Sequence, residues 1–263
     1  MLIDTHAHVN FNAYKEDSSK VLRHSLDNGV WMINVGSQYS TSKRAVEMAE
    51  KYQEGVNAAV GLHPIHVSEE EFDCEKYKRL ALSGSRRVVA VGEIGLDYKP
   101  EYASFKEKQE IVLLQQMDLA QELNLPIIFH CRMAHADLIE ILKSKIKNQI
   151  SKLSGVVHCF TGTWQEAEEY LRMGFYLGFN GIIFRLNLDE IIEKTPLDRI
   201  LLETDCPYLT PLPAEALAKA GPLRNEPIFV KYVAEKIAKT KGLSYEEIAE
   251  ITTQNAKKLF KIK

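Results

Sequence analysis

Two histidines, His6 and His8, stand one residue apart near the start of the chain, in a stretch that is typical of a first β-strand. Side chains two residues apart on a strand point to the same face, with α-carbons about 6.6 Å apart. Two imidazoles on one face are either a fragment of a metal site or two ordinary polar residues, because imidazole is both a common metal ligand and a hydrogen-bonding group. The rest of the chain has to distinguish these possibilities.

Further polar side chains stand at the ends of other apolar runs. The residues that could bind a metal ion or transfer a proton there are His63, Glu93, His130, His158 and Asp205. The runs IIFH and VVHC carry aliphatic side chains right up to an imidazole. Leaving such a group unpaired in a core costs about 1–3 kcal/mol, so each of these histidines needs a partner.

Six of the eight histidines lie at or just beyond such ends, whereas His24 and His135 fall in expected helices, where we expect them on the surface. A single histidine at a strand end is usually a hydrogen-bonded structural residue. Six of them together with two carboxylates predict a metal centre instead.

Four imidazoles and two carboxylates exceed the ligands of one tetrahedral ion. We therefore predict two divalent cations about 3.5–4 Å apart and bridged by a carboxylate. The hypothesis assigns His6, His8 and Asp205 to one ion, His130 and His158 to the other, and Glu93 to both. Imidazole ligands favour Zn, Mn or Ni over Mg, which prefers oxygen ligands; Mg, where abundant, is a further candidate for supporting activity.

The elements that must position these residues are eight short apolar runs, which alternate with longer amphipathic stretches. The runs cover residues 2–6, 30–36, 56–61, 88–93, 126–130, 155–160, 175–181 and 200–205. Near-continuous apolarity indicates strands buried on both faces, as in a parallel sheet under helices. Eight such units in one domain of 263 residues predict an α/β fold, a (β/α)8 TIM barrel, with the site at the C-terminal ends of its strands. A doubly wound open sheet is the rival fold, but no G-x-G-x-x-G follows the first strand.

Capping-box patterns predict helix starts at 68–71, 163–166 and 244–247. A proline-broken loop is expected over 207–227, followed by a helix near 228–240. The loop and this helix come after the eighth strand.

Composition narrows the classes of function. With a net charge of −3, a broad basic surface for duplex nucleic acid is not expected, whereas a phosphate-bearing substrate held at one small site is compatible with it. The chain has no apolar run long enough to cross a membrane, no signal-peptide pattern and no C-x-x-C spacing, so we expect a reduced, cytoplasmic protein without an obligate protein partner. Cys131, Cys159 and Cys206 each follow a predicted ligand and are expected to face the helices as small buried side chains.

Seven motifs together resemble the TatD family of metal-dependent deoxyribonucleases, within the amidohydrolase-like barrels. They are DTHAH (4–8), GLHP (61–64), GEIGLDY (92–98), FHCR (129–132), HCFTG (158–162), ETDCPYLTP (203–211) and RNEP (224–227). The motif H-x-H alone is a weak signal, but the ordered set runs almost end to end. The resemblance implies a TIM barrel, divalent metal ions bound by the same six residues, and hydrolysis of phosphodiester bonds in DNA.

The resemblance also implies that His63 and Arg224 lie near the substrate phosphate. For Arg224, a surface salt bridge with Glu226 is the alternative. Two positions depart from the family pattern. An extra residue precedes His66, so the role of the second imidazole of the H-P-H pattern does not carry over, and Met133 stands where the family tends to have an acidic residue.

The expected reaction is attack on phosphorus by a hydroxide generated at the paired cations, with Asp205 orienting it and accepting its proton. One rival is an amidohydrolase-type enzyme that cleaves C–N or ester bonds, such as an aminoacyl-RNA ester. The other is a metal- or nucleotide-binding protein without catalysis. Many amidohydrolase relatives bridge their ions with a modified lysine on the fourth strand, where this chain has Glu93, and this favours the nuclease.

With a net charge of −3, we also expect any contact with nucleic acid to be short. The expected substrate is a frayed end or a short single strand of DNA. Phe160, Trp164, Phe184 and Tyr208 fall near predicted strand ends and could stack on bases. Aromatic side chains more often pack in cores, so the sequence leaves both roles open for each of them.

Overall fold

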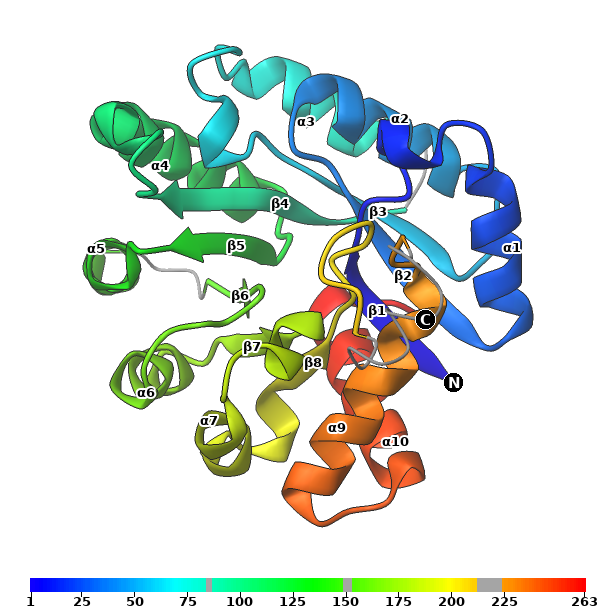
Figure 1. Cartoon of the computed structure of the whole chain (residues 1–263). Coiled ribbons are helices and arrows are strands. Elements are labelled where there is room, and N and C mark those ends of the chain that lie inside the picture. The colour runs from blue at the N-terminus through cyan, green and yellow to red at the C-terminus, as the bar shows by residue number, and fades with distance from the viewer. Residues whose placement is uncertain (84–86, 149–152, 212–223) are drawn as a thin grey trace.

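Eight parallel strands form one sheet in the order of the sequence, with the helices outside it (Figure 1). The computed structural model describes residues 1–83, 87–148, 153–211 and 224–263. The strands are β1 (Leu2–Ala7), β2 (Val30–Val35), β3 (Val56–Val60), β4 (Val88–Asp97), β5 (Ile127–Arg132), β6 (Gly155–Val157), β7 (Tyr176–Phe179) and β8 (Ile200–Leu202). Sequential parallel pairing confirms the predicted (β/α)8 TIM barrel and excludes the doubly wound sheet, whose strand order is not sequential.

The α-helices occupy the predicted amphipathic stretches. They are α1 (Ser18–Asp27), α2 (Tyr39–Ala49), α3 (Cys74–Leu82), α4 (Lys106–Glu122), α5 (His135–Asn148), α6 (Trp164–Arg172), α7 (Asp189–Lys194), α9 (Val230–Lys241) and α10 (Tyr245–Phe260). Of the loop predicted over 207–227, residues 212–223 lie outside the described part of the chain. Within the described ranges, no helix combines the length and the apolar character needed to cross a membrane.

The first and last strands meet at a seam that closes the barrel. Ala7 forms a parallel bridge with Cys206. The buried Asp4 carboxylate accepts hydrogen bonds from the Thr204 N–H at 2.9 Å and from the Thr204 hydroxyl at 2.6 Å. Burial raises the pKa of Asp4 to about 8. The seam therefore brings the H-x-H segment at the start of the chain beside the segment that follows β8.

Helix α10 covers the amino-terminal end of the barrel. Its Leu259 and Phe260 pack with Ile3 and Leu201 in the cluster of apolar side chains inside the sheet. Asn255 of α10 donates a hydrogen bond to the carbonyl of the first residue of β8 at 2.9 Å. With this end covered, the opposite end, where the strands finish, is the one that can hold a site.

Two of the three predicted capping boxes are confirmed, because Thr163 and Ser244 cap α6 and α10 with the expected reciprocal glutamate bonds. The prediction of a helix start at 68–71 is wrong. The glutamates of that segment bond neighbouring segments instead. Helix α3 begins only after Asp73, whose carboxylate accepts the Lys76 N–H at 3.0 Å.

Strands β6 and β8 end at Val157 and Leu202, three residues before their predicted ends. Just beyond them, Cys159 and Asp205 take left-handed backbone conformations, with φ of 46° and 56°. A left-handed residue breaks the alternation of side chains along a strand, and for residues other than glycine it is maintained only by the surrounding structure.

Two glutamines of α4 reach the ends of neighbouring strands. Gln116 accepts the Leu62 N–H at 2.7 Å and donates to the Leu62 carbonyl at 2.9 Å. Gln109 makes the same pair of bonds with the backbone of Asp97, at 2.8 and 3.0 Å. Both side chains are buried, so these bonds hold the backbone beyond β3 and at the end of β4 at the mouth of the barrel.

We expect the substitution Gln116→Ala to lower the free energy of unfolding by about 2–4 kcal/mol, because it leaves a buried N–H and a buried carbonyl of Leu62 unpaired. Urea denaturation monitored by circular dichroism measures this change. Gln115→Ala, at the exposed neighbouring position of the same helix, is the control and should change the value by less than about 0.5 kcal/mol. Equal losses in the two variants would contradict the proposed role of Gln116.

Candidate metal centre

A cavity of about 690 Å³ lies at the carboxyl-terminal ends of the strands. Glu93 on β4 and His130 on β5 line it, together with His8, His158 and Asp205 from the segments just beyond β1, β6 and β8. Residues that are far apart in the sequence are therefore gathered in one pocket, as the barrel geometry requires.

The Glu93 carboxylate faces the H-x-H pair with one of its oxygens. Glu93 Oε2 lies 3.2 Å from His6 Nε2 and 3.8 Å from His8 Nε2. The two Nε2 atoms lie 3.1 Å apart. All three side chains are buried, so this oxygen and two imidazole nitrogens converge on one small region.

The other Glu93 oxygen faces a second group of imidazoles. Glu93 Oε1 lies 2.8 Å from His130 Nδ1, 3.3 Å from His63 Nε2 and 3.7 Å from His158 Nε2. One carboxylate oxygen is thus directed to each group, which is the geometry that a bridging carboxylate presents to two cations.

Asp205 completes the first group. Its Oδ1 lies 3.4 Å from His8 Nε2 and 3.9 Å from His6 Nε2. Burial would raise the pKa of Asp205, but the hydrogen bond with His8 and the charges of His158 and His6 outweigh burial and lower it. The carboxylate is therefore ionised at neutral pH and directed at the H-x-H pair.

Hydrogen bonds on the far ring nitrogens determine which nitrogens can bind a cation. His8 Nδ1 lies 2.8 Å from the Val35 carbonyl, and His158 Nδ1 lies 2.9 Å from the Glu203 carboxylate. Each of these acceptors requires the ring proton on Nδ1, so we assign the lone pair of the neutral ring to Nε2, which faces Glu93. The donor set, imidazole lone pairs and carboxylate oxygens, fits divalent metal ions.

His63 differs from these ligand candidates. Its Nδ1 accepts the Ile65 N–H at 3.2 Å, which places the proton of the neutral ring on Nε2. Burial lowers the pKa of His63 to about 4, so the ring is neutral at pH 7. His63 therefore presents an N–H donor to the cavity, which suits contact with a hydrogen-bond acceptor.

Charges within the centre favour an ionised Glu93. Burial alone would raise its pKa, but His63, His6 and His158 hold the pKa of Glu93 well below its usual range. Burial and the charge of His158 lower the pKa of His6. Burial also opposes protonation of His158, but the charges of Glu203 and Glu93 outweigh it and raise the pKa of His158 to about 10. This excess of negative charge would also attract a cation.

Two buried carboxylates of the centre, Asp97 and Glu203, were missed by the sequence analysis. Asp97 Oδ2 lies 3.0 Å from His130 Nε2, and Glu203 is the partner of His158. Both belong to motifs already noted, and each is an even number of residues from Glu93 or Asp205. For Asp97, which shares β4 with Glu93, strand alternation could therefore have placed the side chain on the inward face, whereas Glu203 lies beyond the end of β8. Position 133, where the family tends to have an acidic residue, is a methionine in this chain. Asp97 nevertheless supplies a carboxylate beside His130.

The remaining predicted positions lie as follows. Arg224 is absent from the cavity wall among the described residues; its guanidinium binds both oxygens of Asp17, at 2.9 and 2.6 Å, and lies 3.3 Å from Glu226. His66 lines the cavity and its Nδ1 lies 2.9 Å from Glu69.

Two expectations are wrong. Cys159 lines the cavity instead of facing the helices, because its left-handed backbone turns the side chain inward. His135 is buried at the start of α5, where its Nδ1 lies 3.0 Å from the Tyr170 hydroxyl, instead of lying on the surface. The sequence of the helix around His135 gave no indication of its contact with Tyr170.

The aromatic side chains divide between core and cavity. Phe160 is fully buried in the apolar core, and Trp164 packs against that core. Tyr208 instead lines the cavity, with 55% of its surface exposed. Phe184 is exposed but is not among the described residues of the cavity wall. Phe11, which the sequence analysis did not single out, lines the cavity and stacks on His8 with ring centroids 4.3 Å apart.

Comparisons with known proteins agree with this geometry. The family model described as TatD related DNase matches residues 3–261. The chain is 43% identical to the uncharacterized metal-dependent hydrolase YabD of Bacillus subtilis (strain 168) over 269 residues, covering all of both chains. It is 36% identical to a 3'-5' ssDNA/RNA exonuclease TatD of Pantoea vagans (strain C9-1), over 99% of this chain and 100% of the relative.

A solved structure is also similar. The TatD homologue YJJV of Escherichia coli K12 superposes with a TM-score of 0.87 at 30% sequence identity, covering 100% of this chain and 98% of that one. The match to the family model over nearly the whole chain, the identity to these relatives and the shared barrel give one conclusion: the chain belongs to the TatD-related DNase family of metal-dependent hydrolases.

Proposed function

We propose that this protein is a divalent-metal-dependent nuclease that removes nucleotides from the ends of short or single-stranded DNA. The observation that carries the proposal is the Glu93 carboxylate, which directs one oxygen to each of two groups of imidazoles in a single cavity. The name of the Pantoea vagans relative, an exonuclease on single-stranded DNA and RNA, supports this choice of substrate.

The cavity wall supports a nucleic-acid strand as the substrate. Lys99, Arg132 and Arg185 line it, and the latter two are exposed, so their charges can contact phosphates. Phe11 and Tyr208 offer ring faces beside His8, and base stacking on such faces tolerates any sequence. A contact of this size suits one or a few nucleotides.

We assign His6, His8, Glu93 and Asp205 to one divalent ion and Glu93, His130 and His158 to the other. When bound, such ions supply a nucleophile at neutral pH and neutralise the charge that builds up on the phosphoryl oxygens. The ligand set favours Zn, Mn or Ni, with Mg as a further candidate.

The chain's own groups have separate tasks in this proposal. The His63 Nε2–H donates a hydrogen bond to a phosphoryl oxygen, because its proton is fixed on the side of the cavity. Asp205, an ionised carboxylate on the cavity wall, orients the attacking water and accepts its proton. Arg224 binds the phosphate through its planar fork, and for this it has to exchange part of its bonding to Asp17 for the substrate.

The protein should release nucleotides from labelled single-stranded DNA in a reaction that a chelator abolishes. Strands labelled at the 3' or the 5' end give the polarity, and an aminoacyl ester, a cyclic dinucleotide and a dihydropyrimidine serve as competing substrates. Turnover of only a carbon-centred substrate would assign the protein to the C–N or ester hydrolases. No turnover of any substrate with metal present would support a binding protein without catalysis.

Glu93→Ala should reduce the bound metal from two ions per chain toward one or none, because it removes the oxygens that face both groups of imidazoles. Elemental analysis after gel filtration measures the stoichiometry. Glu69→Ala, which removes the carboxylate partner of His66, outside the proposed ligand set, is the control and should retain the wild-type content. Unchanged stoichiometry in Glu93→Ala would refute the bridging assignment.

Arg224→Ala should lower kcat/KM on single-stranded DNA by about tenfold or more, since a charge-assisted bond to phosphate is lost, at unchanged metal content. Steady-state kinetics and elemental analysis check the two parts. Asp17→Ala separates the alternatives. If Arg224 acts only as the partner of Asp17, the two variants will lose the same activity; if it binds phosphate, Asp17→Ala will lose less.

A further inference from the structure

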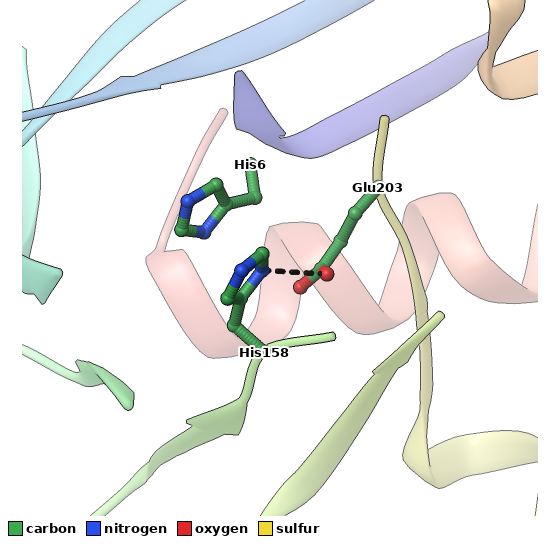
Figure 2. Close-up of side chains that lie close together, drawn as sticks. All are labelled: His6, His158 and Glu203. Atoms are coloured by element: carbon green, nitrogen blue, oxygen red, sulfur yellow. Dashed lines mark hydrogen bonds and ion pairs between the residues drawn. The ribbon is translucent and has the colours of Figure 1, made fainter. Parts of the chain in front are cut away.

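Glu203 is buried directly behind one of the proposed ligands. Figure 2 shows its carboxylate beside the ring of His158, on which the ring of His6 stacks with centroids 3.5 Å apart. Glu203 Oε2 accepts bonds from His158 Nδ1 at 2.9 Å and from the Cys159 N–H at 3.0 Å. The carboxylate is completely inaccessible to solvent. It therefore contacts the imidazole on the side that faces away from Glu93.

The burial of the Glu203 carboxylate lowers the stability of the folded protein. Its Oε1 has no hydrogen-bond partner among the described residues. Gly178 on β7 leaves the space for it, because a Cβ at Gly178 would lie 2.0 Å from Oε1. Burying a carboxylate with one unpaired oxygen is unfavourable unless another charge compensates for it. A cation on the far side of His158 would supply that charge through the imidazole.

Asp97 stands in the same relation to His130. Its Oδ2 lies 3.0 Å from His130 Nε2, while His130 Nδ1 faces Glu93 at 2.8 Å. The other oxygen accepts the Lys99 N–H at 3.0 Å, and Gln109 holds the Asp97 backbone. Asp97 is 1% exposed. His130 and His158, which we assign with Glu93 to the second ion, therefore each have a buried carboxylate at the ring nitrogen that faces away from Glu93.

The first group of imidazoles has no such support. His8 Nδ1 donates to a neutral carbonyl, that of Val35. His6 Nδ1 has no hydrogen-bond partner in the part of the chain that the structure describes. The two groups of imidazoles around Glu93 thus differ in the partners of their far ring nitrogens. His130 and His158 contact carboxylates there. His8 contacts a carbonyl, and His6 has no partner among the described residues.

We propose that Asp97 and Glu203 are positioning residues that act, through His130 and His158, on only one of the two metal ions. This inference rests on the two-ion site of the proposed function. Each carboxylate fixes the ring proton on the far nitrogen and makes the facing nitrogen more basic. Groups of this kind typically contribute 10–100-fold to metal affinity.

Metal titration of the full-length, metal-free protein tests this inference. Zn²⁺ is added in competition with a chromophoric chelator, and the affinities of the two ions are resolved. Glu203→Gln and Asp97→Asn should each weaken one ion by about 10–100-fold and leave the other unchanged. Glu69→Gln is the matched control, because Glu69 makes the same carboxylate–histidine contact with His66, outside the proposed ligand set, and it should leave both ions unchanged.

A spectroscopic measurement separates this role from general damage to the fold. In metal-free wild-type protein, at a pH where the His158 ring is neutral, its ¹⁵N shifts should report the proton on Nδ1, and Glu203→Leu should shift the population toward Nε2–H. Gly178→Ala should weaken the same ion as Glu203→Gln, because the new methyl group displaces the Glu203 carboxylate without removing its charge.

The outcomes are distinct. If wild-type protein binds two ions and both remain unchanged in Glu203→Gln and Asp97→Asn, or both weaken equally, the inference is overturned while the two-ion site stands. If wild-type protein binds no divalent ion, the proposed function itself fails.

Discussion

The centre depends on one constraint, the burial of the ionised carboxylate of Glu93 at the mouth of a closed barrel. Such a group is tolerated only when positive or proton-donating groups surround it. Here the imidazoles of His6, His63, His130 and His158 do so from four other strands or strand ends. In the proposed function, the same arrangement that makes the carboxylate tolerable in the apolar barrel gives two cations a shared oxygen donor.

The fold and the gathering of the six ligand candidates could be predicted from the sequence, because each signal is local. Buried parallel strands are continuous apolar runs, and a polar residue such as His130 or His158 at the end of a run is conspicuous. The barrel then dictates that all these ends meet. The assignment of the six residues as ligands, in contrast, stays a prediction, since it concerns bonds to ions and not the fold.

What the sequence did not reveal depends on partners that are distant along the chain. The residues near His135 in the sequence do not indicate that its ring contacts the Tyr170 hydroxyl. The sequence of α4 likewise does not indicate that Gln116 bonds the backbone of Leu62, 54 residues away. Cys159 was misplaced because strand alternation was extended through a left-handed residue. Glu203 was overlooked although it stands in the same motif as Asp205, two residues before it.

The seam between β1 and β8 has a consequence for how the protein is made. His6 and His8 leave the ribosome almost two hundred residues before Glu203 and Asp205. Until the last strand docks through Asp4 and Thr204, the nascent polypeptide lacks part of its centre. A barrel that joins its first strand to its eighth in this way completes its cavity only after the eighth strand has been made.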